Sequence, residues 1–123
     1  MADVERLCAE AIDLQVGAIC ISPSHLPLTK GLLPSSIKTA AVVGFPSGAH
    51  NPVVKSCEAQ QACEHGANEI DMVTNLAFVS TANWSAITDE VSAVRSAIPS
   101  RVILKVIIES ALWSDEQIIG VCS

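Results

Sequence analysis

The sequence predicts an α/β fold in which parallel strands alternate with helices. Short apolar runs recur about every 20 to 30 residues, and helix-forming segments separate them, which is the rhythm of βα units. Half of all residues are hydrophobic and 16% are charged, and the mean hydropathy is +0.43. Strands covered by helices read as such continuous apolar runs. Connections of this kind give a parallel sheet with right-handed crossovers, and we treat residues 1–123 as a single domain.

Each expected strand is a short run of mostly aliphatic residues that ends at a turn signal. The four runs are residues 18–21, 39–45, 68–75 and 102–109. The first ends at Pro23, and the second runs into a loop rich in glycine, proline and serine.

Helices are expected before, between and after these strands. Asp3 is placed to cap a first helix that Gly17 ends, and residues 24–33 read as a short helix or helical loop. Asn51 and Pro52 begin a helix with a weak apolar stripe that Gly66 closes.

The last two expected helices have clearer signals. Asn83 caps a helix whose apolar residues recur at helical spacing until Pro99 ends it. Ser114 opens the final helix.

Composition narrows the classes of function. The formal net charge is −6 and the basic residues are scattered singly, so neither nucleic acid nor an anionic membrane is an expected partner. No apolar run approaches the roughly 18 to 20 residues of a membrane span, and the first residues lack the pattern of a signal peptide. We therefore expect a cytoplasmic protein.

Cysteine and histidine usage gives no sign of a disulfide framework or a metal site. The cysteines number five, none forms a C-x-x-C motif, and each lies in an apolar stretch. We expect reduced thiols in the core. The three histidines match no zinc spacing, so no metal and no cofactor are expected.

The third strand carries carboxylates where apolar residues are expected. Burying a carboxylate costs several kcal/mol unless a cation or several donors meet it. Glu69 and Asp71 share one face of the strand by alternation, so either could point into a cavity and exchange protons there. A purely structural carboxylate, held by one basic partner, is the alternative.

The fourth strand has a single lysine in an aliphatic run. Lys105 lies on the face that Ile103 and Ile107 also occupy. A lysine among aliphatic residues suits Schiff-base or acid–base chemistry, or pairs with Asp71. Both a doubly wound sheet and part of a (β/α)8 barrel fit the pattern, and inward charges near strand ends favour the barrel.

Two further features have weaker implications. Cys20 lies near the end of the first strand and reads as a small buried thiol. The loop 44–48 lacks the lysine of a phosphate loop, but its glycines would let the backbone approach a ligand.

Four blocks of the sequence, taken together, resemble the deoxyribose-phosphate aldolase family. They occur in order and span nearly the whole chain: 17–23 (GAICISP), 42–48 (VVGFPSG), 66–73 (GANEIDMV) and 104–109 (LKVIIE). The resemblance implies a (β/α)8 barrel and a metal-independent class I aldolase. Such an enzyme interconverts 2-deoxyribose 5-phosphate with acetaldehyde and glyceraldehyde 3-phosphate through a lysine imine, in deoxyribonucleotide catabolism.

The same resemblance implies roles for individual residues and a departure from the family. Asp71 resembles the proton-relay aspartate, Lys105 the accessory lysine of the active site, and Cys20 the cysteine near the substrate. The imine-forming lysine of the family lies in a K-T-S-T-G block, which this sequence does not contain. A full barrel needs about 250 residues, so we expect about half a barrel, resembling strands two to five of eight.

Several readings of the function stay open on the sequence alone. The expected partners are a small phosphorylated sugar and either further copies of the chain or the missing half of the barrel. Alternatively, Lys105 itself forms the imine in a reduced aldolase, or the chain is an inert half barrel that self-associates. A flavodoxin-like binding domain is a third alternative.

Overall fold

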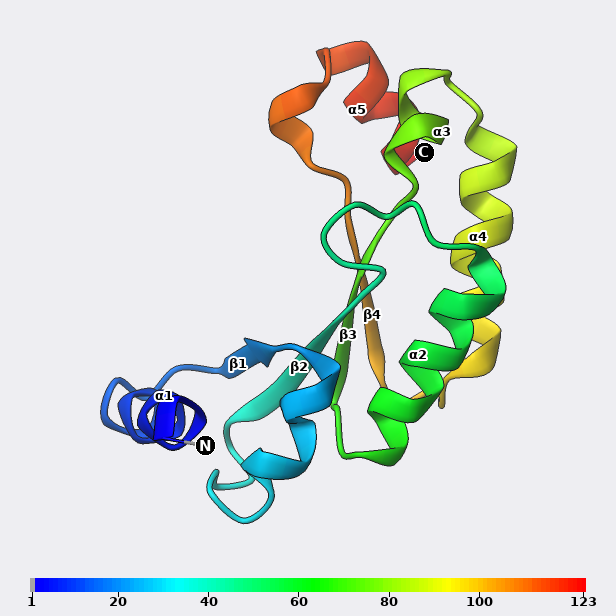
Figure 1. The fold of residues 1–123 in the computed structure, drawn as a ribbon. Helices are drawn as coiled ribbons and strands as arrows, with labels where there is room; N and C mark the ends of the chain where they lie inside the picture. The colour runs from blue at the N-terminus through cyan, green and yellow to red at the C-terminus, as the bar shows by residue number, and fades with distance from the viewer. Residues whose placement is uncertain (1) are drawn as a thin grey trace.

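The computed structural model describes residues 2–123 and contains a four-stranded parallel sheet. The strands are β1 (Ala18–Ile21), β2 (Lys38–Val43), β3 (Glu69–Val73) and β4 (Ile103–Ile107), and they lie side by side in sequence order. All four predicted strands are present, each within two residues of its predicted bounds. Figure 1 shows the strands with connecting segments at both ends of the sheet.

The helices are assigned as follows: α1 (Ala2–Asp13), α2 (Pro52–Glu64), α3 (Leu76–Ser80), α4 (Trp84–Ala97) and α5 (Asp115–Cys122), with the 3-10 helices η1 (Pro23–Thr29) and η2 (Ser110–Leu112). The sequence did not predict α3 or η2, because both are too short to show a periodic stripe. Helices α2 and α4 cover the same side of the sheet (Figure 1).

Three predicted helix caps are confirmed, and one is wrong. The side chains of Asn51, Asn83 and Ser114 each accept a hydrogen bond from a backbone N–H of the first helical turn. Asp3 lies inside the first turn of α1, where it pairs with Arg6 at 3.3 Å instead of capping the helix. That helix ends at Asp13, four residues before Gly17.

The two faces of the sheet have different chemistry. The face toward the helices is the hydrophobic core, and its strand residues are nearly all inaccessible to solvent: Ile19, Ile21, Ala41, Val43, Ile70 and Met72. Residues from α2 and α4, among them Ala59, Ala62 and Val94, complete this core. The other face carries the charged residues of the strands: Lys38, Glu69, Asp71 and Lys105. This division follows from the two-residue period of a strand, which places alternate side chains on opposite faces.

The cysteines depart from the expectation of core thiols. Cys8 is buried and Cys63 is half-buried, but Cys20, Cys57 and Cys122 are exposed, and all five are free. Apolar neighbours in the sequence are therefore a poor guide to cysteine burial here. Cys20 lies on the face of β1 opposite the buried Ile19 and Ile21.

Candidate active site

The strand register brings the predicted site residues together. Asp71 of β3 lies directly beside Lys105 of β4 and Val42 of β2. Side chains opposite each other in neighbouring strands point to the same face. The sequence-based prediction that Asp71 and Lys105 share one face is thus confirmed, and that face is the one opposite the hydrophobic core.

Lys105 is held between two carboxylates. Its Nζ lies 2.7 Å from Glu69 Oε2 and 2.8 Å from Asp71 Oδ1. The carboxylates are mostly buried, at 16% and 17% exposure, while the lysine side chain is 47% exposed. The two carboxylates, Asp71 first and then Glu69, hold the pKa of the Lys105 ammonium well above its usual range. The sequence left open which carboxylate would point to the functional face, and both contact Lys105 on the face opposite the core.

Cys20 reaches the same cluster from β1. Its Sγ donates a hydrogen bond to Asp71 Oδ2 at 3.4 Å. Partial burial, and then the hydrogen bond and the charge of Asp71, raise the pKa of the Cys20 thiol to about 11. The thiol is consequently neutral at physiological pH and acts as a hydrogen-bond donor. It is a poor nucleophile in this form, because the thiolate is the nucleophilic form.

Both carboxylate oxygens of Asp71 lie beside another member of the cluster. Oδ1 is buried and meets no hydrogen-bond donor of proper geometry among residues 2–123, although the Lys105 ammonium lies beside it. Buried carboxylate oxygens normally accept hydrogen bonds. Oδ1 therefore has the Lys105 ammonium as its neighbouring charge, and Oδ2 has the Cys20 thiol.

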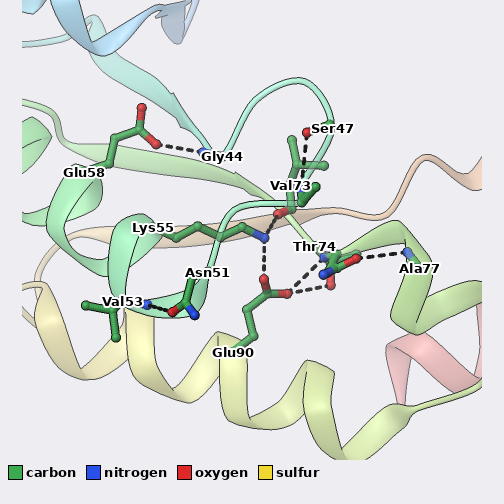
Figure 2. Close-up of polar contacts among 12 residues, drawn as sticks. Gly44, Ser47, Asn51, Val53, Lys55, Glu58, Val73, Thr74, Ala77 and Glu90 are labelled. Carbon is green, nitrogen blue, oxygen red and sulfur yellow. Dashed lines mark hydrogen bonds and ion pairs between the residues drawn. The ribbon is translucent and has the colours of Figure 1, made fainter.

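A second, fully buried ion pair lies behind the end of β3 and was not predicted. Lys55 of α2 pairs with Glu90 of α4, and neither side chain is exposed. Lys55 Nζ also donates to the carbonyl of Val73 at 2.8 Å. Figure 2 shows this pair between the two helices and the segment that follows β3.

Glu90 connects the pair to the backbone after β3. Its Oε2 accepts hydrogen bonds from Thr74 Oγ1 at 3.1 Å and from the Asn75 N–H at 3.0 Å (Figure 2). The pair therefore holds Val73, Thr74 and Asn75, at and just beyond the end of the strand that carries Asp71. The pair thus anchors the chain at the C-terminal end of β3.

The glycines of the loop 44–48 serve this anchoring rather than a ligand. Gly44 and Gly48 both have positive φ, +63° and +67°. A Cβ on Gly44 would lie 2.8 Å from the side chain of Lys55, and one on Gly48 would lie 1.9 Å from the carbonyl oxygen of Thr74. The expectation that these glycines admit a ligand is therefore replaced by close packing within the chain.

Sequence reasoning missed Lys55 and Glu90 because it treats charged helix residues as solvated. A signal was present, however. Lys55 lies four and seven residues before the buried Ala59 and Ala62, the spacing of one helix face. Glu90 lies in the same way between Ile87 and Val94.

The described residues contain neither a metal-binding cluster nor a membrane-spanning helix. Among residues 2–123, no group of three or more histidine, cysteine, aspartate or glutamate side chains is arranged to hold a metal ion. Within the same residues, no helix has the length and apolar character needed to cross a membrane.

Known proteins with similar sequence and structure are aldolases. The chain is 46% identical over 119 residues to the deoxyribose-phosphate aldolase of Kocuria rhizophila, covering 97% of this chain and 53% of that protein. It superposes on the tetrameric deoxyribose phosphate aldolase of Aeropyrum pernix with a TM-score of 0.82 and 32% identity, covering 98% of this chain and 50% of that one.

A provisionally assigned deoxyribose-phosphate aldolase from Coccidioides immitis superposes with a TM-score of 0.92 and 30% identity, covering 98% and 48% of the two chains. The chain spans about half the length of the curated relatives it matches. Its fold is accordingly α/β, corresponding to about half of the (β/α)8 barrel of these aldolases. Residues 1–120 match the DeoC/LacD family aldolase, and the chain belongs to that family.

Proposed function

We propose that this chain supplies one side of the active site of a deoxyribose-phosphate aldolase. The reaction is the reversible cleavage of 2-deoxyribose 5-phosphate to acetaldehyde and glyceraldehyde 3-phosphate through a lysine imine, in cytoplasmic deoxyribonucleotide catabolism. The observation that carries this proposal is the cluster of Asp71, Lys105 and Cys20 on the face of the sheet opposite the core. The names of the relatives support the substrate.

Asp71 is proposed to move the protons of the reaction. When the C2–C3 bond of the imine breaks, the C3 hydroxyl gives up a proton and C2 becomes the carbon of an enamine, which then takes up a proton. Both transfers need a group that accepts and returns a proton within hydrogen-bond reach. Asp71 is the carboxylate that contacts both Lys105 and Cys20, so it is the member of the cluster best placed for this exchange.

Lys105 is proposed to act through its charge rather than as the imine-forming amine. An amine must lose its proton before it attacks a carbonyl, and the two neighbouring carboxylates oppose that loss by raising the pKa of Lys105. Lys55 is fully buried against Glu90 and cannot meet a substrate.

Lys30 follows η1 and Lys38 begins β2, so neither belongs to the cluster of Asp71, Lys105 and Cys20. The sequence also lacks the K-T-S-T-G block in which the family that it resembles has its imine-forming lysine. We therefore propose that this lysine lies outside these 123 residues, in the part of the barrel that the relatives have in addition.

Trapping of the imine separates this assignment from the reduced-aldolase alternative. The chain is incubated with acetaldehyde and borohydride, digested, and its peptides are mapped by mass spectrometry. We expect no adduct on Lys105 near neutral pH. A stoichiometric adduct on Lys105, absent from the Lys105→Gln variant, would show that Lys105 is the imine lysine after all.

A chimera tests the activity itself. Residues 1–120 replace the matching part of the Kocuria rhizophila relative, which supplies the rest of the barrel. We expect cleavage of 2-deoxyribose 5-phosphate, reduced about 100-fold to 10,000-fold by Asp71→Asn, as for loss of a general acid–base. Asp89→Asn, an exposed carboxylate of α4, is the matched control and should retain full turnover. A folded but inactive chimera, or full turnover in Asp71→Asn, would contradict the proposal.

A further inference from the structure

A cavity of about 600 Å³ lies at the edge of the sheet where the strands begin. The residues around it come from η1 and the segment up to β2 on one side, and from the end of α2 and the start of β3 on the other. Its volume is typical of small-molecule sites. Asn68, on its wall, precedes Asp71 by three residues, and a strand rises about 3.3 Å per residue. The cavity therefore lies roughly 10 Å from the cluster of Asp71, Lys105 and Cys20, called the aldolase cluster below.

Basic side chains gather at this cavity. Lys30, Lys38 and His65 line it, with Glu64 as its one carboxylate. The chain has four lysines, of which Lys55 and Lys105 are held in ion pairs. Within residues 2–123 the ion pairs include neither Lys30 nor Lys38.

Both lysines without a carboxylate partner therefore meet at one cavity. The chain as a whole has a formal net charge of −6, so this surplus of positive charge is local. Both ammonium groups are positively charged, and an anion bound between them would reduce their mutual repulsion.

The other lining groups add a donor and an apolar wall. The side chain of Lys38 is directed by its hydrogen bond to the Ser35 carbonyl at 2.8 Å. Asn68 Oδ1 accepts from the Thr39 N–H at 3.0 Å, which leaves the amide NH2 of Asn68 to donate. The apolar part of the wall consists of Leu26, Pro27, Leu33, Pro34 and Ile37.

We infer that this cavity binds a small phosphate monoester with an apolar or aromatic body. The phosphate lies between Lys30 and Lys38, and the body packs on the wall that Leu33 and Pro34 form. A dianion suits two cations, and an apolar wall beside a few polar groups is the usual composition of a ligand site. The site is distinct from the aldolase cluster and does not depend on its activity.

Calorimetric titration with phenyl phosphate tests the inference at low ionic strength. We expect saturable binding to the wild-type chain and binding at least tenfold weaker to the double variant Lys30→Gln/Lys38→Gln. Both lysines are exposed, so the variant should fold, which circular dichroism checks. Arg6→Gln is the matched control, because Arg6 is an exposed cation of α1 paired with Asp3; its affinity should equal that of the wild type.

Inorganic phosphate tests the anionic group without the apolar body. It should bind at least tenfold more weakly than phenyl phosphate. Equal affinity for the two would overturn the apolar part of the inference. Absence of saturable binding, or undiminished binding by the lysine variant, would overturn the whole of it. Phenyl phosphate has no carbonyl and forms no imine, so these results leave the aldolase proposal untouched.

Discussion

Lys105 gives the fold a distinctive response to alkaline pH. A pKa raised in the folded state stabilises the fold below the unfolded value of about 10.4, and this contribution is lost as pH rises toward the folded value. The pKa of Lys105 is raised by Asp71 and Glu69. Above about pH 10, the unfolding free energy of the wild type should therefore fall more steeply than that of Lys105→Gln.

Urea unfolding at stepped pH measures that slope. Lys30→Gln is the control, because Lys30 is exposed and the ion pairs among residues 2–123 do not include it. Its slope should match the wild type. Identical slopes for the wild type and Lys105→Gln would contradict the pairing of Lys105 with Asp71 and Glu69.

Cys20 is exposed but should react slowly. Its thiol pKa of about 11 leaves little thiolate at pH 8. Iodoacetamide at that pH should label the exposed Cys57 before Cys20, as peptide mass mapping would show. Asp71→Asn removes a negative charge next to the thiol, so labelling of Cys20 should speed up severalfold while that of Cys57 stays the same. Labelling of wild-type Cys20 as fast as Cys57 would count against the assigned contact with Asp71.

At the scale of elements, the buried pair of Lys55 and Glu90 joins α2, α4 and the end of β3. Removal of one partner leaves the other charge buried and unpaired. We expect Lys55→Met to lower the unfolding free energy by about 3–5 kcal/mol. The double variant Lys55→Met/Glu90→Leu should recover part of this loss, because it leaves no charge behind.

Chemical denaturation measures both variants against a surface control. Arg6→Met breaks an exposed pair on α1 and should cost less than about 1 kcal/mol. A Lys55→Met variant no less stable than Arg6→Met would show that the buried pair does not hold the elements together.

The elements were predictable where local sequence dominates. Aliphatic runs located the strands, and Asn51, Asn83 and Ser114 located helix starts through their own side-chain hydrogen bonds. The ion pair of Lys55 and Glu90 was not predictable in this way, because it joins residues 35 apart in the chain. Charged residues gain from burial only when the partner arrives, and sequence periodicity does not reveal the partner.

For the whole molecule, the unpaired edge strands of the sheet predict association. Among residues 2–123, β1 and β4 each have a strand neighbour on one side only, and unpaired strand edges pair readily with another chain. Ile103, on the last strand, is 54% exposed. We expect the weight-average mass in sedimentation equilibrium to rise with concentration. A cooperatively unfolding monomer over the micromolar range would contradict this expectation.

The two-sidedness of the sheet could be predicted, but its electrostatics could not. Alternation along a strand places Glu69 and Asp71 together, and also Ile103 and Lys105. The register between β3 and β4 then decides which of them meet, and that register depends on the whole sheet. The reach of Cys20 to Asp71 across β2 depends on it as well.

The contrasting surroundings of the four lysines affect how the chain could be attached to a solid support. Amine-directed coupling cannot reach Lys55, which has no exposed surface, and it is disfavoured at Lys105, whose proton is tightly held. Among the side-chain amines, this leaves Lys30 and Lys38 as the points of attachment, at the rim where the strands begin. A chain immobilised through them would present the carboxylate-bearing side and the strand ends outward, oriented for contact with a soluble second half.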